Sequence, residues 1–275
     1  MKLNKQLAIL HSQALELVYS DKALTEDERY FILEHYHEAG NNANTLSGAF
    51  FTPLSLAKDF AVMNDYNHHR IVDLCAGIGR LSYHYQNRYS WSKRTNEITC
   101  IEVNPEYVDV GKRTVPEANW ILADIFSVDY QSLGQFDLAI SNPPFGKIKT
   151  GNNFTGSYTG SDFEFKCLEL ASTIAKNGAF ILPQESSPFK YSGSREYIET
   201  SGWKFADFLK KSNFNSQFFC CSIDTSHVLN DWRNVKPLCE VIEFDFLEQL
   251  NFKEQLNNLS LAMDSKNTDV QLGLF

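Results

Sequence analysis

The sequence predicts an α/β fold in which helices cover both faces of a mostly parallel sheet, with an antiparallel strand at one edge. Short apolar runs rich in β-branched residues alternate along the chain with segments of helical periodicity. These runs are almost continuously apolar, which is typical of strands buried on both faces. The 275 residues, 43% of them hydrophobic, are enough for one large domain with a buried core.

Residues 1–47 are predicted to form a separate helical segment. Thr25 and Glu28 have the spacing of a capping box, which predicts a helix that continues to about His37. His37 has no metal-ligand partners at a useful spacing and is expected at the surface. A threonine N-cap followed by proline at positions 52–53 predicts the start of the next helix.

The later strands and helices are predicted from composition and period. Strands are expected at residues 70–75, 97–103, 120–125, 136–141 and 179–183. Helices are expected at residues 105–113 and 162–176. A late run at 239–246 is expected to be the antiparallel edge strand. Residues 48–258 would then form one domain, followed at 259–275 by a polar tether that ends in QLGLF.

Composition and charge narrow the class of protein. No apolar run approaches the length of a membrane span. The apolar stretch near the N-terminus is interrupted by polar residues and is too short for a signal peptide. The six cysteines lack C-x-x-C spacing, which indicates reduced thiols in the core of a cytoplasmic protein. The net charge of −9 argues against a nucleic-acid partner, but residues 144–215 carry nine basic and seven acidic residues. That segment is where a phosphate backbone would be tolerated.

A glycine-rich turn follows the first predicted strand. The strand runs into DLCAGIGRL, which contains Asp73, Gly77 and Gly79. Glycines let such a turn pass close to a ligand, and the start of the next helix offers free N–H groups. An ordinary tight turn is the alternative interpretation.

Acidic residues end the next two strands. Glu102 lies 23 positions after Gly79, where nucleotide-binding folds place a carboxylate for ribose hydroxyls. Asp124 follows the third strand, and its neighbours Ile125 and Phe126 could flank a purine ring. The alternatives are a solvated strand-end acid for Glu102 and a helix N-cap for Asp124. Together, the order and spacing of these residues indicate a nucleotide-type cofactor.

The stretch AISNPPFG at 139–146 ends the fourth predicted strand with an amide and two prolines. After a nucleotide-binding array, this stretch is a candidate for contact with a substrate, with the Asn142 side-chain oxygen as an acceptor and the Phe145 ring as a stacking face. The alternative is a Pro-Pro turn with a packed phenylalanine.

The chain resembles class I S-adenosylmethionine-dependent methyltransferases of the adenine-N6 type. The resemblance is carried, in this order, by TP at 52–53, DLCAGIG, IEVNP, ADIF and NPPF. The resemblance covers about half of the chain, residues 48–190. It implies a Rossmann-like fold, S-adenosyl-L-methionine as the cofactor, and methyl transfer to a flipped adenine in double-stranded DNA.

The resemblance also implies the roles of individual residues. The residues at 51–53 would contact the methionine end of the cofactor, and Asp73 with the glycine turn would lie under its amino-acid and sulfonium region. Glu102 would bind the ribose hydroxyls and Asp124 the adenine amino group. The implied cofactor-binding residues are Phe51, Thr52, Pro53, Asp73, Ala76, Gly77, Gly79, Glu102, Val103, Asp124, Ile125 and Asn142. The implied catalytic residues are Asn142, Pro143, Pro144 and Phe145.

The resemblance gives NPPF a chemical role. An exocyclic amine is a poor nucleophile because its lone pair is delocalised into the ring. The Asn142 side-chain oxygen and the Pro143 carbonyl would accept its two N–H bonds and aim the lone pair at the methyl donor. Phe145 would offer a face on which a flipped base can stack.

The motif specifies a planar amino group rather than adenine itself. Release-factor glutamine methyltransferases have a similar N-P-P sequence, and some ribosomal-RNA adenine methyltransferases have NPPFG. Structured RNA and a glutamine amide are therefore alternative substrates. Many members of the family have tyrosine where this chain has Phe145, which keeps the stacking face but lacks the hydroxyl.

The loop at 146–161 is rich in glycine and is predicted to be a mobile flap over the substrate. Gly146, Lys147 and Lys149 would lie near DNA phosphates, and a merely disordered loop is the alternative. The stretch after the strand at 179–183 leaves little room for an independent target-recognition domain. We therefore expect short or relaxed sequence specificity.

The C-terminal QLGLF resembles the peptide by which bacterial DNA polymerases and repair proteins bind the sliding clamp. The resemblance implies that Gln271 orients the peptide while Leu272, Leu274 and Phe275 enter an apolar groove. It favours DNA as the substrate of a replication-associated enzyme from a bacterium, phage or plasmid. The alternatives are a terminal strand packed on its own domain, and a non-enzymatic cofactor-binding module that contacts the clamp. A pure binder has no need of two amine acceptors, and the oligomeric state is not predicted.

Overall fold

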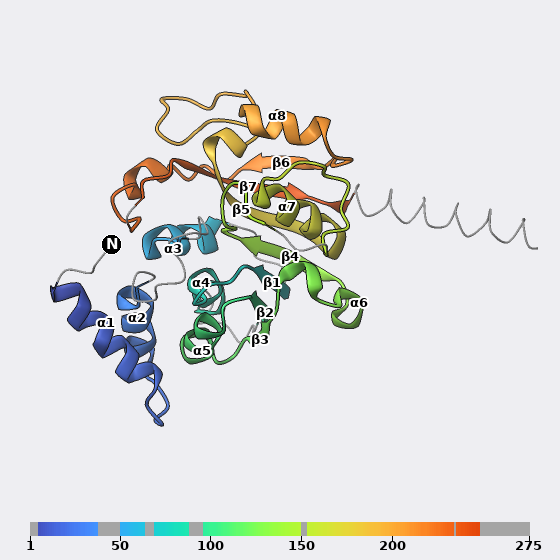
Figure 1. Cartoon of the computed structure of the whole chain (residues 1–275). Helices are drawn as coiled ribbons and strands as arrows, with labels where there is room; N and C mark the ends of the chain where they lie inside the picture. The colour runs from blue at the N-terminus through green and yellow to red at the C-terminus, as the bar shows by residue number, and fades with distance from the viewer. Residues whose placement is uncertain are drawn as a thin grey trace, which may run out of the picture.

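A seven-stranded sheet lies between layers of helices in the computed structural model (Figure 1). The structure describes residues 5–37, 50–63, 69–87, 96–149, 153–233 and 235–247. The strands are β1 (Arg70–Leu74), β2 (Glu97–Glu102), β3 (Asn119–Leu122), β4 (Phe136–Ser141), β5 (Ala175–Pro183), β6 (Gln217–Cys220) and β7 (Cys239–Asp245). Their order across the sheet is β3-β2-β1-β4-β5-β7-β6. The predicted α/β fold with a mostly parallel sheet is confirmed.

The antiparallel part of the sheet differs from the prediction in one respect. β1 to β5 pair in parallel, and β7 pairs antiparallel with both β5 and β6. The late run is antiparallel as predicted, but β7 lies inside the sheet and β6 forms the edge. Both edges of β7 are paired, and its side chains pack in the apolar clusters on both faces of the sheet, so the strand is almost fully buried. β6 has four residues, alternately exposed and half-buried, and it was not among the predicted strands.

Helices cover both faces of the sheet. The helices after the N-terminal pair are α3 (Leu54–Met63), α4 (Arg80–Asn87), α5 (Pro105–Thr114), α6 (Tyr130–Leu133), α7 (Phe163–Ile174) and α8 (Trp203–Lys210). Phe60 of α3 packs in one apolar cluster with Ile71, whereas Phe165 of α7 packs in the other with Val72. Ile71 and Val72 are neighbours on β1, so the two clusters lie on opposite faces of the sheet.

Several element boundaries differ from those predicted, by up to four residues. β3 ends at Leu122 because Asp124 caps a short 3₁₀ helix, η2 (Ile125–Ser127), by accepting a hydrogen bond from the Phe126 N–H. β5 begins at Ala175, four residues before the predicted strand, because its pairing with β4 continues to that residue. α7 therefore ends at Ile174, and the prediction that this helix continues to residue 176 was wrong.

The N-terminal helices are α1 (Lys5–Val18) and α2 (Glu26–His35). The predicted capping box is confirmed, since Thr25 and Glu28 each accept a hydrogen bond from the backbone N–H of the other. Both helices pack against α5 in one apolar cluster that includes Leu33 and Val110. This cluster connects the N-terminal segment to the sheet domain.

His37 is buried, and the prediction of a surface position was wrong. Its side chain and backbone are 6% exposed, and its N–H donates to His11 Nδ1 at 3.1 Å. Burial, with a smaller contribution from the Arg233 charge, lowers the pKa of His37 to about 4. Arg233 donates to the carbonyls of Tyr36 and Glu34. The region after β6 therefore contacts the end of α2 and the residues that follow it. The local sequence around His37 does not reveal this tertiary contact.

No helix in the described ranges is both long and apolar enough to cross a membrane. All six cysteines carry free thiols. The polar tether and the QLGLF peptide lie outside the described residues.

Candidate active site

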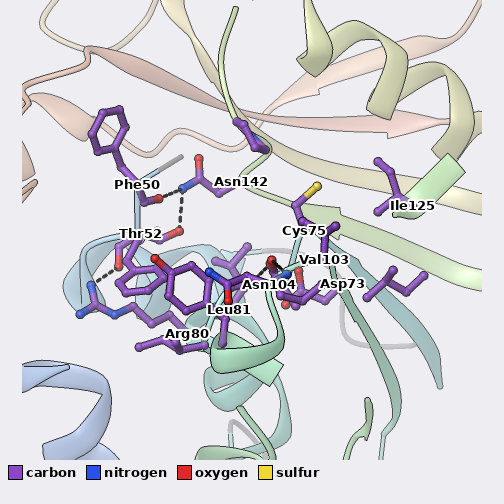
Figure 2. A pocket seen from close by; sticks show the side chains of 18 of the residues that line it. Phe50, Thr52, Asp73, Cys75, Arg80, Leu81, Val103, Asn104, Ile125 and Asn142 are labelled. Atoms are coloured by element: carbon purple, nitrogen blue, oxygen red, sulfur yellow. Dashed lines mark hydrogen bonds between the residues drawn. The ribbon is translucent and has the colours of Figure 1, made fainter. Parts of the chain in front are cut away.

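A cavity of about 260 Å³ lies at the carboxyl ends of β1, β2 and β4 (Figure 2). From β1 the chain adds β2 and β3 on one side, and then returns to add β4 and β5 on the other. Where the strand order reverses in this way, the loops after adjacent strands separate and form a crevice. The cavity occupies this crevice.

Most of the predicted site residues line the cavity. They are Phe51, Thr52, Asp73, Ala76, Gly77, Glu102, Val103, Asp124, Ile125, Asn142, Pro144 and Lys149. These residues come from segments that are far apart in the sequence, and the strand ends bring them together.

The other predicted site residues lie beside the cavity rather than on its wall. They are Pro53, Gly79, Pro143, Phe145, Gly146 and Lys147. The Pro53 carbonyl accepts the N–H of Ala57 at the start of α3. Phe145 is half-buried against the apolar cluster beneath α3 and α4. Lys147 is exposed and forms a β-bridge with Asp162.

The loop at 146–161 differs from the predicted mobile flap over the part that is described. Glu169 of α7 accepts the N–H of Ser157 at 2.6 Å and that of Tyr158 at 2.8 Å. Tyr158 is buried, and its ring meets those of Phe165 and Phe208. Residues 153–161 are therefore anchored on α7 and α8, while residues 150–152 lie outside the described part of the chain.

Sequence reasoning missed a second set of cavity-lining residues. They are Phe50, Cys75, Ile78, Arg80, Leu81, Ile101, Asn104, Tyr107, Ala123, Ile148 and Phe163. A signal for Tyr107 was present, because Asn104 followed by proline predicts a helix start directly after β2. Asn104 does cap α5, accepting the Glu106 N–H at 3.0 Å. The Tyr107 ring meets the Phe51 ring edge to face at 4.9 Å.

The turn after β1 requires unusual backbone angles. Cys75 and Gly77 both have left-handed φ angles, +62° and +57°. The Gly77 N–H donates to Glu102 Oε2 at 2.8 Å, which ties the turn to the end of β2. A Cβ atom at Gly77 would lie 3.3 Å from the Phe51 ring. Glycine therefore permits both the bend and the close approach of Phe51.

Two buried carboxyl groups line the cavity. Asp73 is 1% exposed and accepts the Ser82 hydroxyl at 2.6 Å; burial raises the pKa of Asp73 to about 7 against that hydrogen bond. Glu102 is 8% exposed and accepts the N–H groups of Gly77 and Asn104, each at 2.8 Å. Burial raises the pKa of Glu102 as well. A cationic ligand would favour the ionised form of both groups.

Asp124 caps a short helix and also lines the cavity, so it can act both as an N-cap and as an acceptor for a ligand. Its Oδ1 accepts the Phe126 N–H at 2.9 Å, which is the predicted alternative of a helix cap. Asp124 is also half-buried and lines the cavity. A carboxylate has two oxygens and several lone pairs, so capping leaves acceptor capacity for a ligand.

The Asn142 amide has a fixed orientation (Figure 2). Its Nδ2 donates to the Phe50 carbonyl at 3.1 Å and to Thr52 Oγ1 at 2.9 Å. Its Oδ1 points the other way, and it is buried with no hydrogen-bond partner among the described residues. Arg80 in turn holds this region by donating to the carbonyls of Thr52, at 2.8 Å, and Leu33.

Comparison with known proteins agrees with this architecture. The family model described as Methyltransferase small domain matches residues 56–156. A candidate class I S-adenosylmethionine-dependent methyltransferase from Listeria monocytogenes has a similar structure, with a TM-score of 0.59 and 13% identity over 87% of this chain and 80% of that one. The fold is that of a class I methyltransferase.

Two larger methyltransferases also share this fold. One is a candidate type I restriction enzyme modification subunit from Vibrio vulnificus, with a TM-score of 0.55 and 13% identity over 82% of this chain and 50% of that one. The other is a type I restriction-modification methyltransferase subunit from Streptococcus thermophilus, with a TM-score of 0.54 and 17% identity over 80% and 48%. The chain spans about half the length of these two proteins. No curated protein sequence matches it.

The class I methyltransferase fold and the family match support S-adenosylmethionine as the cofactor. The cavity suits this molecule, because its sulfonium and ammonium groups are cations and two buried carboxyl groups line the walls. Phe51 and Tyr107 add apolar surface to the same walls.

Proposed function

We propose that this chain transfers a methyl group from S-adenosylmethionine to the N6 amine of adenine in DNA, with the base flipped out of the duplex. The Asn142 amide carries the proposal. Its Nδ2 is held by two acceptors, so its Oδ1 is the atom available to a substrate, and that oxygen is buried without a partner among the described residues. A buried acceptor of this kind is costly unless a ligand supplies the donor.

A planar exocyclic amine supplies donors of the required geometry. Asn142 Oδ1 would accept one of its N–H bonds and the Pro143 carbonyl the other. Holding both N–H groups favours a pyramidal nitrogen whose lone pair points towards the cofactor side of the cavity. Pro143 and Pro144 restrict the backbone that carries these acceptors, so the arrangement is preorganised.

The other cavity residues would hold the cofactor. S-adenosylmethionine, when bound, supplies an electrophilic methyl group on a sulfonium cation. Asp73 and Glu102 would contribute negative charge and hydrogen-bond acceptors, with Glu102 bonding the ribose and Asp124 the adenine amino group. No strong general base is required, because the methylated amine is acidic and can lose its proton to water.

DNA is the substrate that several features favour. Two proteins that share the fold are described as subunits of type I restriction-modification enzymes. The segment 144–215, which follows the N-P-P motif, is the part of the chain in which basic residues outnumber acidic ones. Lys149 lines the cavity and Lys147 is exposed beside it, so both could approach phosphates. We expect short or relaxed sequence specificity.

Labelled S-adenosylmethionine, incubated with duplex DNA, structured RNA or a glutamine-containing protein, tests the substrate class. We expect label in duplex DNA, recovered as N6-methyladenine after digestion. Label found only in RNA or in a glutamine side chain would contradict DNA as the substrate, but it would still support methylation of a planar NH₂ group. No transfer to any of the three would overturn the enzymatic function.

We also propose that the QLGLF peptide tethers the enzyme to the replication sliding clamp. Its residues lie outside the described part of the chain, and the proposal depends on the sequence alone: a glutamine and three apolar residues after a polar stretch. A peptide of the last ten residues should bind bacterial clamp with a dissociation constant of micromolar order, about −8 kcal/mol. Deleting Gln271–Phe275 should abolish clamp binding but leave methylation of short duplexes intact. Loss of activity on short duplexes would show that the tail belongs to the catalytic domain.

A further inference from the structure

Glu164 is a buried acid that the proposed chemistry does not use. It is the second residue of α7, it is 0% exposed, and it is not among the described residues that line the cavity. A carboxyl group without contact to water requires strong compensation from hydrogen bonds.

Two hydrogen bonds provide this compensation, and they come from two different loops. Glu164 Oε2 accepts the N–H of Gly146 at 2.8 Å, directly after the N-P-P-F sequence. Glu164 Oε1 accepts the Ser186 hydroxyl at 2.9 Å. Ser186 ends the 3₁₀ helix η3 (Gln184–Ser186), which follows β5. One side chain thus joins the loops after β4 and β5.

The start of α7 holds Gly146 from both sides. Glu164 takes its N–H, and the Phe163 N–H donates to its carbonyl at 2.9 Å. Gly146 has a φ angle of +85°, and a Cβ atom there would meet nothing within 4 Å. The conformation, rather than the space, therefore requires glycine at this position.

The position of Gly146 determines that of the motif. Between Gly146 and Asn142 lie three residues, of which Pro143 and Pro144 have restricted backbone angles. Asn142 is fixed at the other end by its Nδ2 hydrogen bonds. The short turn is thus anchored at both ends and has little freedom in between.

We propose that Glu164 is a positioning residue for methyl transfer. Its hydrogen bond from the Gly146 N–H keeps Asn142 Oδ1 and the Pro143 carbonyl at the spacing that the substrate amine requires. This inference rests on the amine methylation proposed above. A displacement of about 1 Å in such acceptors can cost on the order of a hundredfold in rate.

The role depends on geometry and not on charge. Burial raises the pKa of Glu164. A protonated carboxyl group, or a glutamine amide, still offers one oxygen to Gly146 and one donor to the Ser186 hydroxyl, which can also accept. Glutamine should therefore replace Glu164, whereas aspartate, which keeps the charge but is one methylene shorter, should not.

The test compares Glu164→Gln, Glu164→Asp and Glu164→Ala on duplex DNA. We expect kcat within about threefold of wild type for the glutamine variant and at least roughly tenfold lower for the other two, on the scale of misplaced catalytic groups. The dissociation constant of S-adenosylmethionine, measured by calorimetry, should change by no more than about twofold, because Glu164 does not line the cavity and its two hydrogen bonds go to Gly146 and Ser186.

Glu169 offers a matched control on the same helix. It is also buried, and it anchors Ser157 and Tyr158 instead of the motif. Glu169→Asp should lower the melting temperature as Glu164→Asp does, since both loosen a loop held by a buried carboxyl group. It should leave kcat within about threefold, because its partners do not carry the proposed acceptors.

Amide hydrogen exchange at Gly146 provides a readout that needs no activity. Exchange should quicken by at least about tenfold in Glu164→Ala and stay slow in Glu164→Gln. Wild-type kcat in the aspartate and alanine variants would overturn the inference. The inference would also be overturned if kcat of Glu164→Gln were as low as that of Glu164→Ala while amide exchange at Gly146 stayed slow, since that result indicates a role for the charge of Glu164. If alanine prevents folding, the aspartate–glutamine pair decides. If the wild-type protein were inactive on every substrate, the proposed function would be refuted. Amide exchange at Gly146 would still test whether Glu164 holds that backbone N–H.

Discussion

The acids at the carboxyl ends of β1, β2 and β3 differ in their surroundings from the two buried acids that hold the loops after β4 and β5. On the first side, Asp73, Glu102 and Asp124 all line the cavity. Each accepts hydrogen bonds from the protein through one or both oxygens but still has a ligand-facing surface.

On the second side, two acids that hold the loops, one on α7 and one on β7, are fully enclosed. Glu164 and Glu240 are both 0% exposed, and both carboxylate oxygens of each are used. Glu240 accepts the Gln184 amide and both the N–H and the hydroxyl of Ser192, and so holds the loop after β5. Acids next to a cavity are suited to bind a ligand, whereas enclosed acids fix the chain that carries the reacting groups.

The sharpest test of this division is Asn142→Ala, which removes the acceptor on the substrate side. Methyl transfer should fall by at least about a hundredfold, the scale of losing one preorganised polar contact in a transition state. S-adenosylmethionine binding should stay within a few-fold, because the cofactor-side acids are untouched. Single-turnover kinetics with calorimetry checks both parts. Near-wild-type turnover would remove Asn142 from the chemistry.

On the cofactor side, Glu102→Ala and Asp124→Ala should each weaken S-adenosylmethionine binding by roughly 1–3 kcal/mol, since each removes a polar partner of a buried ligand group. Calorimetry measures the change. Glu97→Ala is the matched control, because Glu97 begins the same strand as Glu102 but is exposed. Unchanged affinity in both site variants would place the cofactor elsewhere.

Asp73 should couple cofactor binding to pH. Its pKa in the folded protein is about 7, above the ordinary 3.8, so the folded state without ligand holds a proton that the unfolded state releases. Stability of the ligand-free protein should therefore fall as pH rises from about 4 to about 7. A cationic cofactor favours ionised Asp73, so its affinity should rise by about tenfold between pH 6 and pH 8. Calorimetry in buffers of different ionisation enthalpy should detect proton release at pH 6, and Asp73→Asn should abolish it.

The smallest expected effect is that of Thr52→Val, which removes an acceptor of Asn142 Nδ2 with little change in shape. Losing one such hydrogen bond should lower kcat by roughly three- to tenfold. Thr173→Val on the exposed face of α7 is the control and should have no effect. An unchanged kcat in Thr52→Val would mean that the Phe50 carbonyl alone orients the amide.

The parts of the fold with a strong local signal were predictable. The apolar runs of β1 to β4, the capping box at Thr25 and the glycine turn after Asp73 are all properties of a few consecutive residues. β6 was not predictable, because its four residues pair with β7 only through tertiary structure.

The same distinction applies to the site. The residues at the strand ends that line the cavity follow from motif order, whereas Glu164 acts on a backbone group 18 residues away. Arg80 links the carbonyls of Leu33 and Thr52, which lie in separate segments. Long side chains that bond to remote backbone leave no periodic pattern, so only a structure reveals them.

The position of β7 between β5 and β6 has a consequence for how the chain is made. β5 ends at Pro183, and its partner β7 begins at Cys239. At a synthesis rate of about 5–20 residues per second, the ribosome needs roughly 3–11 s to reach β7 after completing β5. During that interval an apolar strand has one unpaired hydrogen-bonding edge, the feature on which nascent chains aggregate. The demand for chaperone protection in the cell should therefore be greatest while residues 184–239 are being translated.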